Sequence, residues 1–249
     1  MFSPIGHRII QLGSVDSTNN YAATLISEGQ AEHGTVILAE EQTAGKGQRG
    51  AVWVSEPGLN LTFSVILKPA NLSVLDQFMI SRCVAVSLVH VLRKFGISGI
   101  VKWPNDILVG QKKIAGVLIE SQILSGLVQS CIVGVGLNVN QSEFEGLNAT
   151  SLKVETGNFI PLMEVLLMSV NEFEMIWKEM TLGSSEPIER EYLGMLYGTF
   201  GAVMMKDVNG TFEGLVEGTD RSGLLIVNVG GEKRKYDLKE ISFLFQNES

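Results

Sequence analysis

Residues 100–137 constrain the fold most, because they hold a run of β-prone segments separated only by short turns. Pro104 interrupts the first segment, and glycine-containing turns at 110–111 and 125–126 separate the next two. Segments joined by such tight turns pair as antiparallel strands. Proline cannot donate a ladder hydrogen bond, so its position marks a bulge or an edge. The stretch therefore predicts an antiparallel meander.

The flanking patterns extend this prediction to an α+β fold with two units. Strand-like runs occur at 8–13, 35–39 and 59–67, helical patterns at 21–26, 73–96, 161–180 and 186–196, and a polar, loop-like segment at 141–158. From residue 197, short alternating runs between glycine-containing turns predict a small β-barrel of about five strands. We therefore expect a mixed or antiparallel sheet packed with helices over 1–196 and a barrel over 197–249.

Composition indicates a globular protein with an ordinary core. Hydrophobic residues make up 45% of the chain and charged residues 18%, and the net charge is −8. An acidic chain is a poor main partner for nucleic acid or an anionic membrane. The N-terminus lacks a signal-peptide pattern, and no apolar run is long enough to predict a membrane span, so we expect a cytoplasmic protein.

The two cysteines, Cys83 and Cys131, lie in apolar segments. Neither has a second cysteine or a histidine at metal-ligand spacing. The pattern predicts buried free thiols in a reducing compartment, in preference to a disulfide or a metal site.

A glycine-rich stretch at 40–53 predicts a local anion site. Gly45, Gly47 and Gly50 let the backbone approach a ligand, and Lys46 and Arg49 bring positive charge to the same place. The spacing matches the dinucleotide fingerprint formally, but no helix follows to receive a pyrophosphate. A flexible surface hairpin is the alternative interpretation.

Two polar clusters accompany this loop. Ser17, Thr18 and Asn19 open a predicted helix, where capping accounts for one of the three and leaves the others for a polar ligand. Around Pro104 stand a cation, an amide and a carboxylate, which are more than a solvated face requires. These are Lys102, Asn105 and Asp106.

In this order, the motifs resemble the biotin protein ligases, also called biotin–acetyl-CoA-carboxylase ligases. The matching segments are 16–19, Gln42 with 45–50 and Trp53, 102–106, 113–116, 134–138 and the terminal barrel. The resemblance covers nearly the whole chain. It implies a class II synthetase-like catalytic domain over 1–196, an SH3-like barrel over 197–249, and the monofunctional type that lacks a DNA-binding helix-turn-helix.

The resemblance also implies a reaction. Biotin and ATP would give biotinyl-5′-AMP and pyrophosphate, and the biotinyl group would pass to a lysine of a biotin carboxyl carrier protein. It implies ATP and Mg²⁺ as cofactors and biotin as substrate. The acidic composition leads us to expect no nucleic-acid or membrane partner. Either a monomer or a homodimer is compatible with the resemblance.

Site residues follow from the resemblance. It assigns catalysis to Lys113, Lys46 and Arg49. Biotin binding falls to Ser17, Thr18, Asn19, Gln42, Lys46, Gly47, Gln48, Lys113 and Gly116. ATP binding falls to Gly45, Gly47, Arg49, Gly50, Trp53, Lys102, Asn105 and Asn138, and a metal would meet Asp106. Without the resemblance, Lys113 would be interpreted as an exposed strand lysine, Trp53 as a core or interface residue and Asn138 as a turn cap.

One motif departs from the family pattern. The family loop commonly reads Gly-Arg-Gly-Arg-x-Gly-Arg-x-Trp, whereas Lys46, Gln48 and Ala51 stand at the three arginine positions. Lysine lacks the bidentate fork of arginine, and the other two residues carry no charge. We therefore expect a weaker or differently arranged hold on the intermediate.

Two other functions share these features. Lipoate or octanoate ligases and transferases have the same catalytic fold, but the transferases need a nucleophilic cysteine. Cys131 lies in an apolar strand, where thiolate formation is disfavoured. A non-enzymatic protein that binds biotin or nucleotide would need the pocket but could dispense with Lys113.

Overall fold

The computed structural model describes residues 3–245. The helices are α1 Thr18–Ser27, α2 Phe78–Lys94, α3 Leu152–Thr156, α4 Leu162–Leu182 and α5 Glu186–Met195, and single 3-10 turns lie at Gln48–Gly50 and Val74–Asp76. The first seven strands are β1 Arg8–Val15, β2 Thr35–Gln42, β3 Leu61–Leu67, β4 Gly99–Lys102, β5 Asp106–Val109, β6 Lys112–Leu124 and β7 Leu127–Leu137. The last five are β8 Val203–Asp207, β9 Gly210–Thr219, β10 Leu225–Val229, β11 Glu232–Tyr236 and β12 Ser242–Phe243.

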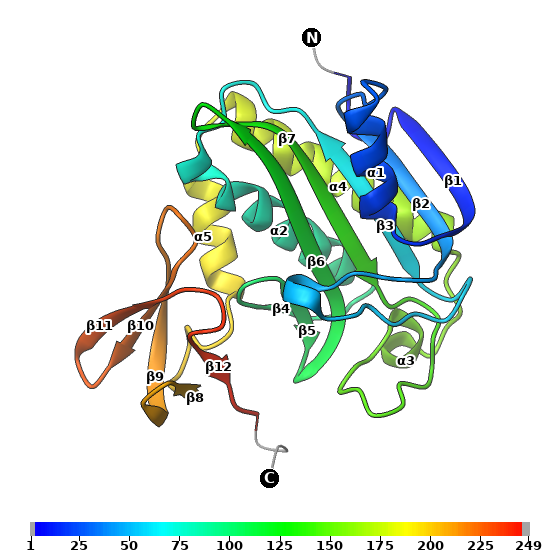
Figure 1. Cartoon of the computed structure of the whole chain (residues 1–249). Coiled ribbons are helices and arrows are strands. Elements are labelled where there is room, and N and C mark those ends of the chain that lie inside the picture. The colour runs from blue at the N-terminus through cyan, green and yellow to red at the C-terminus, as the bar shows by residue number, and fades with distance from the viewer. Residues whose placement is uncertain (1–2, 246–249) are drawn as a thin grey trace.

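The strands form two sheets, as Figure 1 shows. The first has the order β1-β2-β3-β7-β6-β5-β4 and the second the order β11-β10-β9-β8-β12. In the first sheet β1 runs parallel to β2, and the consecutive strands β4 to β7 form the predicted antiparallel meander. The second sheet, called the C-terminal sheet below, is antiparallel throughout its described pairs. The predicted α+β class is confirmed, and the predicted boundary at 196 lies between α5 and β8.

Helices cover the first sheet on both faces (Figure 1). α1 packs on β2, β3 and β7 over a small apolar cluster, whereas α2 contacts β4, β5 and β6 on the other face and packs against α4 and α5. The main core lies on the α2 side. The face that carries α1 is covered only in part, which leaves room over the glycine-containing strands β6 and β7.

The core helix corrects one expectation from the sequence. Within the described residues, the stretch Val74–Lys94 is long and apolar enough to cross a membrane by length and composition, although we predicted no such run. Of its most apolar window, 61% is buried inside the protein. The apolar character follows from packing on nearly every side, against the sheet and against α4 and α5.

The segment 141–158 is also more structured than predicted, because it contains α3. The Ser151 hydroxyl accepts a hydrogen bond from the Val154 amide at 3.2 Å, and Gly157 ends the helix at a φ of +75°. Both side-chain groups of Asn140 bond the backbone of Ile160, at 2.8 and 2.9 Å. Local caps and this clamp order a segment that shows no helical periodicity in the sequence.

Candidate active site

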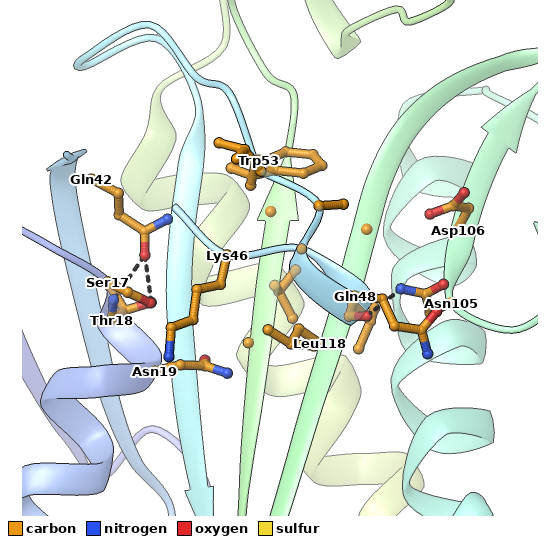
Figure 2. A pocket seen from close by; sticks show the side chains of 18 of the residues that line it. Ser17, Thr18, Asn19, Gln42, Lys46, Gln48, Trp53, Asn105, Asp106 and Leu118 are labelled. Atoms are coloured by element: carbon orange, nitrogen blue, oxygen red, sulfur yellow. Dashed lines mark hydrogen bonds between the residues drawn. The ribbon is translucent and has the colours of Figure 1, made fainter. Parts of the chain in front are cut away.

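A cavity of about 240 Å³ lies on the α1 face of the first sheet, between the start of α1, the glycine-rich loop and strands β6 and β7 (Figure 2). It brings together most of the predicted site. Its lining includes Ser17, Thr18, Asn19, Gln42, Lys46, Gly47, Gln48, Trp53, Asn105, Asp106, Lys113 and Gly116. Residues up to 119 positions apart in sequence, such as Ser17 and Gly136, thus share one space.

One end of the cavity is a network of uncharged hydrogen-bonding groups. The Gln42 side-chain oxygen accepts from the Thr18 amide at 2.8 Å and from its hydroxyl at 3.1 Å, as Figure 2 shows. The side chains of Thr18 and Asn19 are almost fully buried, and the Asn19 amide donates to a Glu120 carboxylate oxygen at 2.6 Å. Fixed neutral donors and acceptors of this kind suit a polar, uncharged head group.

Ser64 completes this network and was missed from the sequence. Its hydroxyl lies 2.7 Å from the Thr18 hydroxyl and 2.6 Å from the Asn19 side-chain oxygen, and the residue is fully buried. Thr62 and Ser64 are polar residues at alternate positions of the otherwise apolar strand β3. That alternation is the signal that could have located Ser64, since alternate residues of a strand share one face.

Paired glycines form the floor of the cavity. Gly116 on β6 lies directly opposite Gly136 on β7, and Ser64 on β3 lies opposite Gly134. A Cβ at Gly136 would overlap the Trp53 indole, and one at Gly134 would overlap the Asn19 side-chain oxygen. The missing side chains therefore let an aromatic ring and an amide approach the backbone of the sheet closely.

The glycine-rich loop leaves the end of β2, as predicted, and folds back on itself. The Trp53 amide donates to the Gly45 carbonyl at 3.0 Å, and the Gly47 amide donates to the Ala51 carbonyl at 2.7 Å. A Cβ at Gly45 would overlap the Trp53 carbonyl. The indole nitrogen of Trp53 is buried without a hydrogen-bond partner. The fold of the loop therefore places the flat apolar ring of Trp53 over the glycine floor of the cavity.

Lys46 extends from this loop toward the start of α1. Its Nζ donates to the Asn20 side-chain oxygen at 2.5 Å, and Asn20 in turn hydrogen-bonds Asp16. The Asn20 amide and, to a smaller degree, the Lys46 charge hold the pKa of the Asp16 carboxyl below its usual value. Lys46 therefore lies beside the head-group network, at the position where the family pattern has its first arginine.

Lys113 faces the cavity because of a β-bulge. The β5–β6 register changes from Ile107 opposite Ala115 to Leu108 opposite Lys113, so Ile114 is an extra residue on β6. In a regular strand Lys113 and Ala115 would share a face, away from Gly116. The extra residue moves Lys113 to the Gly116 side, an example of how a bulge redirects a side chain.

The bulge brings Lys113 to Asp106 and Trp53. Its Nζ lies 2.5 Å from the Asp106 carboxylate and 5.5 Å from the centre of the Trp53 ring. The Asn105 side chain, next to Asp106, donates to the Val117 carbonyl at 2.7 Å, and the Val117 amide donates back to the Asn105 carbonyl. A cation, a carboxylate and an amide are thus fixed at the end of the cavity opposite Ser17.

Other predicted residues lie outside the cavity lining. Lys102 places its Nζ 4.8 Å above the Phe245 ring. Asn138 is buried and donates to the Thr150 carbonyl at 3.0 Å, so its side chain holds the chain that follows β7. Gly45 and Gly50 shape the loop backbone, with Gly50 at a φ of +86°. The Arg49 side chain lies outside the described part of the chain.

No cluster of three or more histidine, cysteine, aspartate or glutamate side chains within residues 3–245 forms a metal site. Asp106 is the acidic group among the cavity-lining residues. Magnesium is commonly held by one or two protein carboxylates together with substrate phosphates. A single carboxylate beside Lys113 fits that type of site.

Comparison with known proteins identifies the family. The sequence model of the biotin/lipoate A/B protein ligase family matches residues 12–138, about half of the 249 residues. The chain belongs to this family. The bifunctional ligase/repressor BirA of Bacillus subtilis is 31% identical over 240 residues, which cover 93% of this chain and 73% of that protein.

Two further relatives match the present chain over almost their whole length. The biotin–[acetyl-CoA-carboxylase] ligase of Paracoccus denitrificans is 29% identical over 246 residues, 93% of this chain and 99% of that protein. The structure of the biotin protein ligase from Aquifex aeolicus in complex with biotin and ATP superposes with a TM-score of 0.79 at 26% identity, covering 96% of this chain and 99% of that one. The relationship therefore includes the C-terminal sheet.

Proposed function

We propose that this protein is an ATP-dependent biotin ligase, which forms biotinyl-5′-AMP and transfers the biotinyl group to a lysine of a biotin carboxyl carrier protein. One observation carries the proposal. A single cavity joins a pocket of fixed neutral hydrogen-bonding groups to a cation–carboxylate pair, over a floor of glycines. Biotin has the same division, with an uncharged ureido head at one end and a carboxylate at the other.

In the first step, a carboxylate oxygen of biotin attacks the α-phosphorus of ATP, and pyrophosphate leaves. Thr18, Asn19, Gln42 and Ser64 would hold the head group, which places the carboxylate toward Lys113. Negative charge accumulates where carboxylate meets phosphate, and a fixed cation there lowers the barrier. Lys113 is positioned for this role, and Asp106 would contribute a ligand to a magnesium ion on the phosphates, which helps to neutralise their charge.

In the second step, the amine of a carrier lysine attacks the acyl carbon of the adenylate, and AMP leaves.

The nucleotide needs its own binding surface in both steps. The Trp53 indole offers a face against which the adenine can stack. The indole N–H of Trp53 is buried and has no hydrogen-bond partner in the described part of the protein. Gln48 and Ala51, where the family pattern has arginine, line the cavity without charge, which fits the expected weaker or differently arranged hold on the adenylate.

A mass measurement tests the substrate. A carrier domain incubated with the protein, ATP and magnesium should gain the mass of one biotinyl group when biotin is supplied. Lipoate in place of biotin should give no comparable gain, because the head-group pocket is built from hydrogen-bonding groups. Ready transfer of a lipoyl or octanoyl group without biotinylation would disprove the proposal.

The thiols provide a second test, since a cysteine-dependent transferase shares this fold. Burial raises the pKa of both Cys83 and Cys131 to about 12. Such thiols stay protonated near neutral pH and are poor nucleophiles. We therefore expect Cys83→Ala with Cys131→Ala to keep near-normal biotin transfer and to lose about 1–2 kcal/mol of stability from packing. Loss of transfer in a folded variant would support an acyl-cysteine route.

A further inference from the structure

The loop between β9 and β10 fixes the C-terminal sheet to the catalytic body beside the active site. Within this loop, residues 220–224, the Asp220 carboxylate accepts hydrogen bonds from the Ser222 amide and hydroxyl and from the Leu224 amide, at 2.7 to 3.1 Å. Burial alone would raise the pKa of Asp220, but these bonds and one from Lys235 lower it to about 2. The loop therefore has one defined conformation of its own.

Charged side chains tie this loop to α2 and to the 3-10 turn that precedes it. Arg82 is 95% buried, and its guanidinium donates to the Thr219 hydroxyl and to the Asp220 carbonyl, both at 3.0 Å. Arg221 makes a bidentate pair with Asp76 at 2.5 and 2.7 Å. Contacts at both sides of the loop leave it little freedom relative to the first sheet.

The contact nearest the active site is made by Trp103. Its indole N–H donates to the Gly223 carbonyl at 2.9 Å, and the ring is almost fully buried. Gly223 has a φ of +98°, and a Cβ there would overlap the Phe78 ring, so the carbonyl is presented by a backbone that only glycine suits. A second cavity of about 560 Å³, bordered by Gly223, shares Asn105 with the active-site cavity.

Trp103 stands at the start of the turn that carries the reacting end of the site. Asn105 and Asp106 follow it within three residues, and Asp106 pairs with Lys113. The connection therefore runs from the Gly223 carbonyl through Trp103 to Asp106 and Lys113. The head-group network of Thr18, Asn19, Gln42 and Ser64 has no part in it.

We propose that Trp103 is a positioning residue for the adenylation step, and that its hydrogen bond to the β9–β10 loop holds Asn105, Asp106 and, through Asp106, Lys113 in register with the reacting groups. The inference rests on the proposed function. It makes the C-terminal sheet part of the support of the active site. A misplacement of about 1 Å at reacting groups can cost as much as 10²-fold in rate.

The test is Trp103→Phe in the full chain. Phenylalanine keeps an aromatic ring in the core but removes the N–H, which leaves the Gly223 carbonyl without its donor. We expect kcat for biotin-dependent exchange of pyrophosphate into ATP, with carrier omitted, to fall by about tenfold. The KM for biotin should stay within about twofold, because the head-group network is untouched.

Trp177→Phe is the matched control. Trp177 is also a buried tryptophan, on α4 and away from the cavity, so its loss should lower the melting temperature without lowering kcat. If Trp103→Phe fails to fold, Arg221→Gln loosens the same loop from an exposed position and should lower kcat by about two- to threefold at unchanged KM for biotin.

The outcomes separate the two proposals. An unchanged kcat in folded Trp103→Phe, or a fall in kcat accompanied by an equal rise in the KM for biotin, would overturn the positioning role. The proposed function would still stand in that case, provided that the unmodified protein catalyses biotin-dependent exchange of pyrophosphate into ATP. Absence of exchange in the unmodified protein would overturn the proposed function, and this inference with it.

Discussion

Lys113→Ala should reduce adenylate formation by about 10²-fold or more, while the protein remains folded. The bulge at Ile114 places the Lys113 ammonium on the cavity side, 2.5 Å from the Asp106 carboxylate. Without it, the reacting carboxylate and α-phosphate would meet beside an unopposed negative charge. Because the ion pair is partly exposed, its loss should cost no more than about 1 kcal/mol of stability. Pyrophosphate release with biotin and ATP, carrier omitted, measures the step.

Lys112→Ala is the control for this experiment. Lys112 is the exposed neighbour on the same strand and lies outside the cavity lining, so its removal changes the net charge equally without touching the site. We expect near-normal pyrophosphate release from that variant. Comparable rates from Lys113→Ala and Lys112→Ala would remove Lys113 from the catalytic groups.

Gly134→Ala should raise the KM for biotin by about 10- to 100-fold, with a smaller effect on kcat. The new methyl group would overlap the Asn19 side-chain oxygen, which Ser64 holds from one side, while Glu120 holds the Asn19 amide. The head-group network cannot shift as a unit, so one of its hydrogen bonds must break. A site built for hydrogen bonding discriminates strongly when a partner is lost.

Gly13→Ala separates a local clash from a general effect of alanine in a strand. Gly13 lies on β1 of the same sheet, and a Cβ there meets no atom within 4 Å. Its KM for biotin should match that of the unmodified protein. Titration calorimetry with biotin alone checks both variants without turnover, and equal affinities would contradict the role given to Asn19.

The sequence predicts much of the fold because the signals are local. Turn glycines and alternating apolar residues locate the β4–β7 meander and the C-terminal strands. The polar residues at 17–19 locate the start of α1, but the capping expected of one of them is wrong for Ser17, which makes no side-chain cap hydrogen bond. It does not predict Ser64, whose role depends on lying opposite Gly134 on a strand 70 positions away. Nor does it predict α3, which depends on a cap and a clamp and shows no periodicity.

Site residues divide in the same way. Motif order places Thr18, Lys46 and Lys113 in one cavity, where the structure has them. The directions of Lys102 and Asn138 depend on partners distant in sequence, Phe245 for the first and Thr150 beyond a loop for the second. Residue type and spacing do not show whether a long side chain such as Lys102 or an amide such as Asn138 turns toward a ligand or toward another part of the protein.

The extra residue in β6 has a consequence for sequence change in the β5–β6 hairpin. Its turn at Gly110 and Gln111 is exposed, and exposed turns usually accept insertions and deletions. Here, loss of Ile114 would abolish the bulge and send the ammonium of Lys113 to the opposite face of the sheet. Deletion of Ile114 should therefore inactivate the protein while leaving it folded, whereas point substitutions in the exposed turn should be tolerated. Library selection for biotin-dependent growth would separate the two classes of variant by length alone.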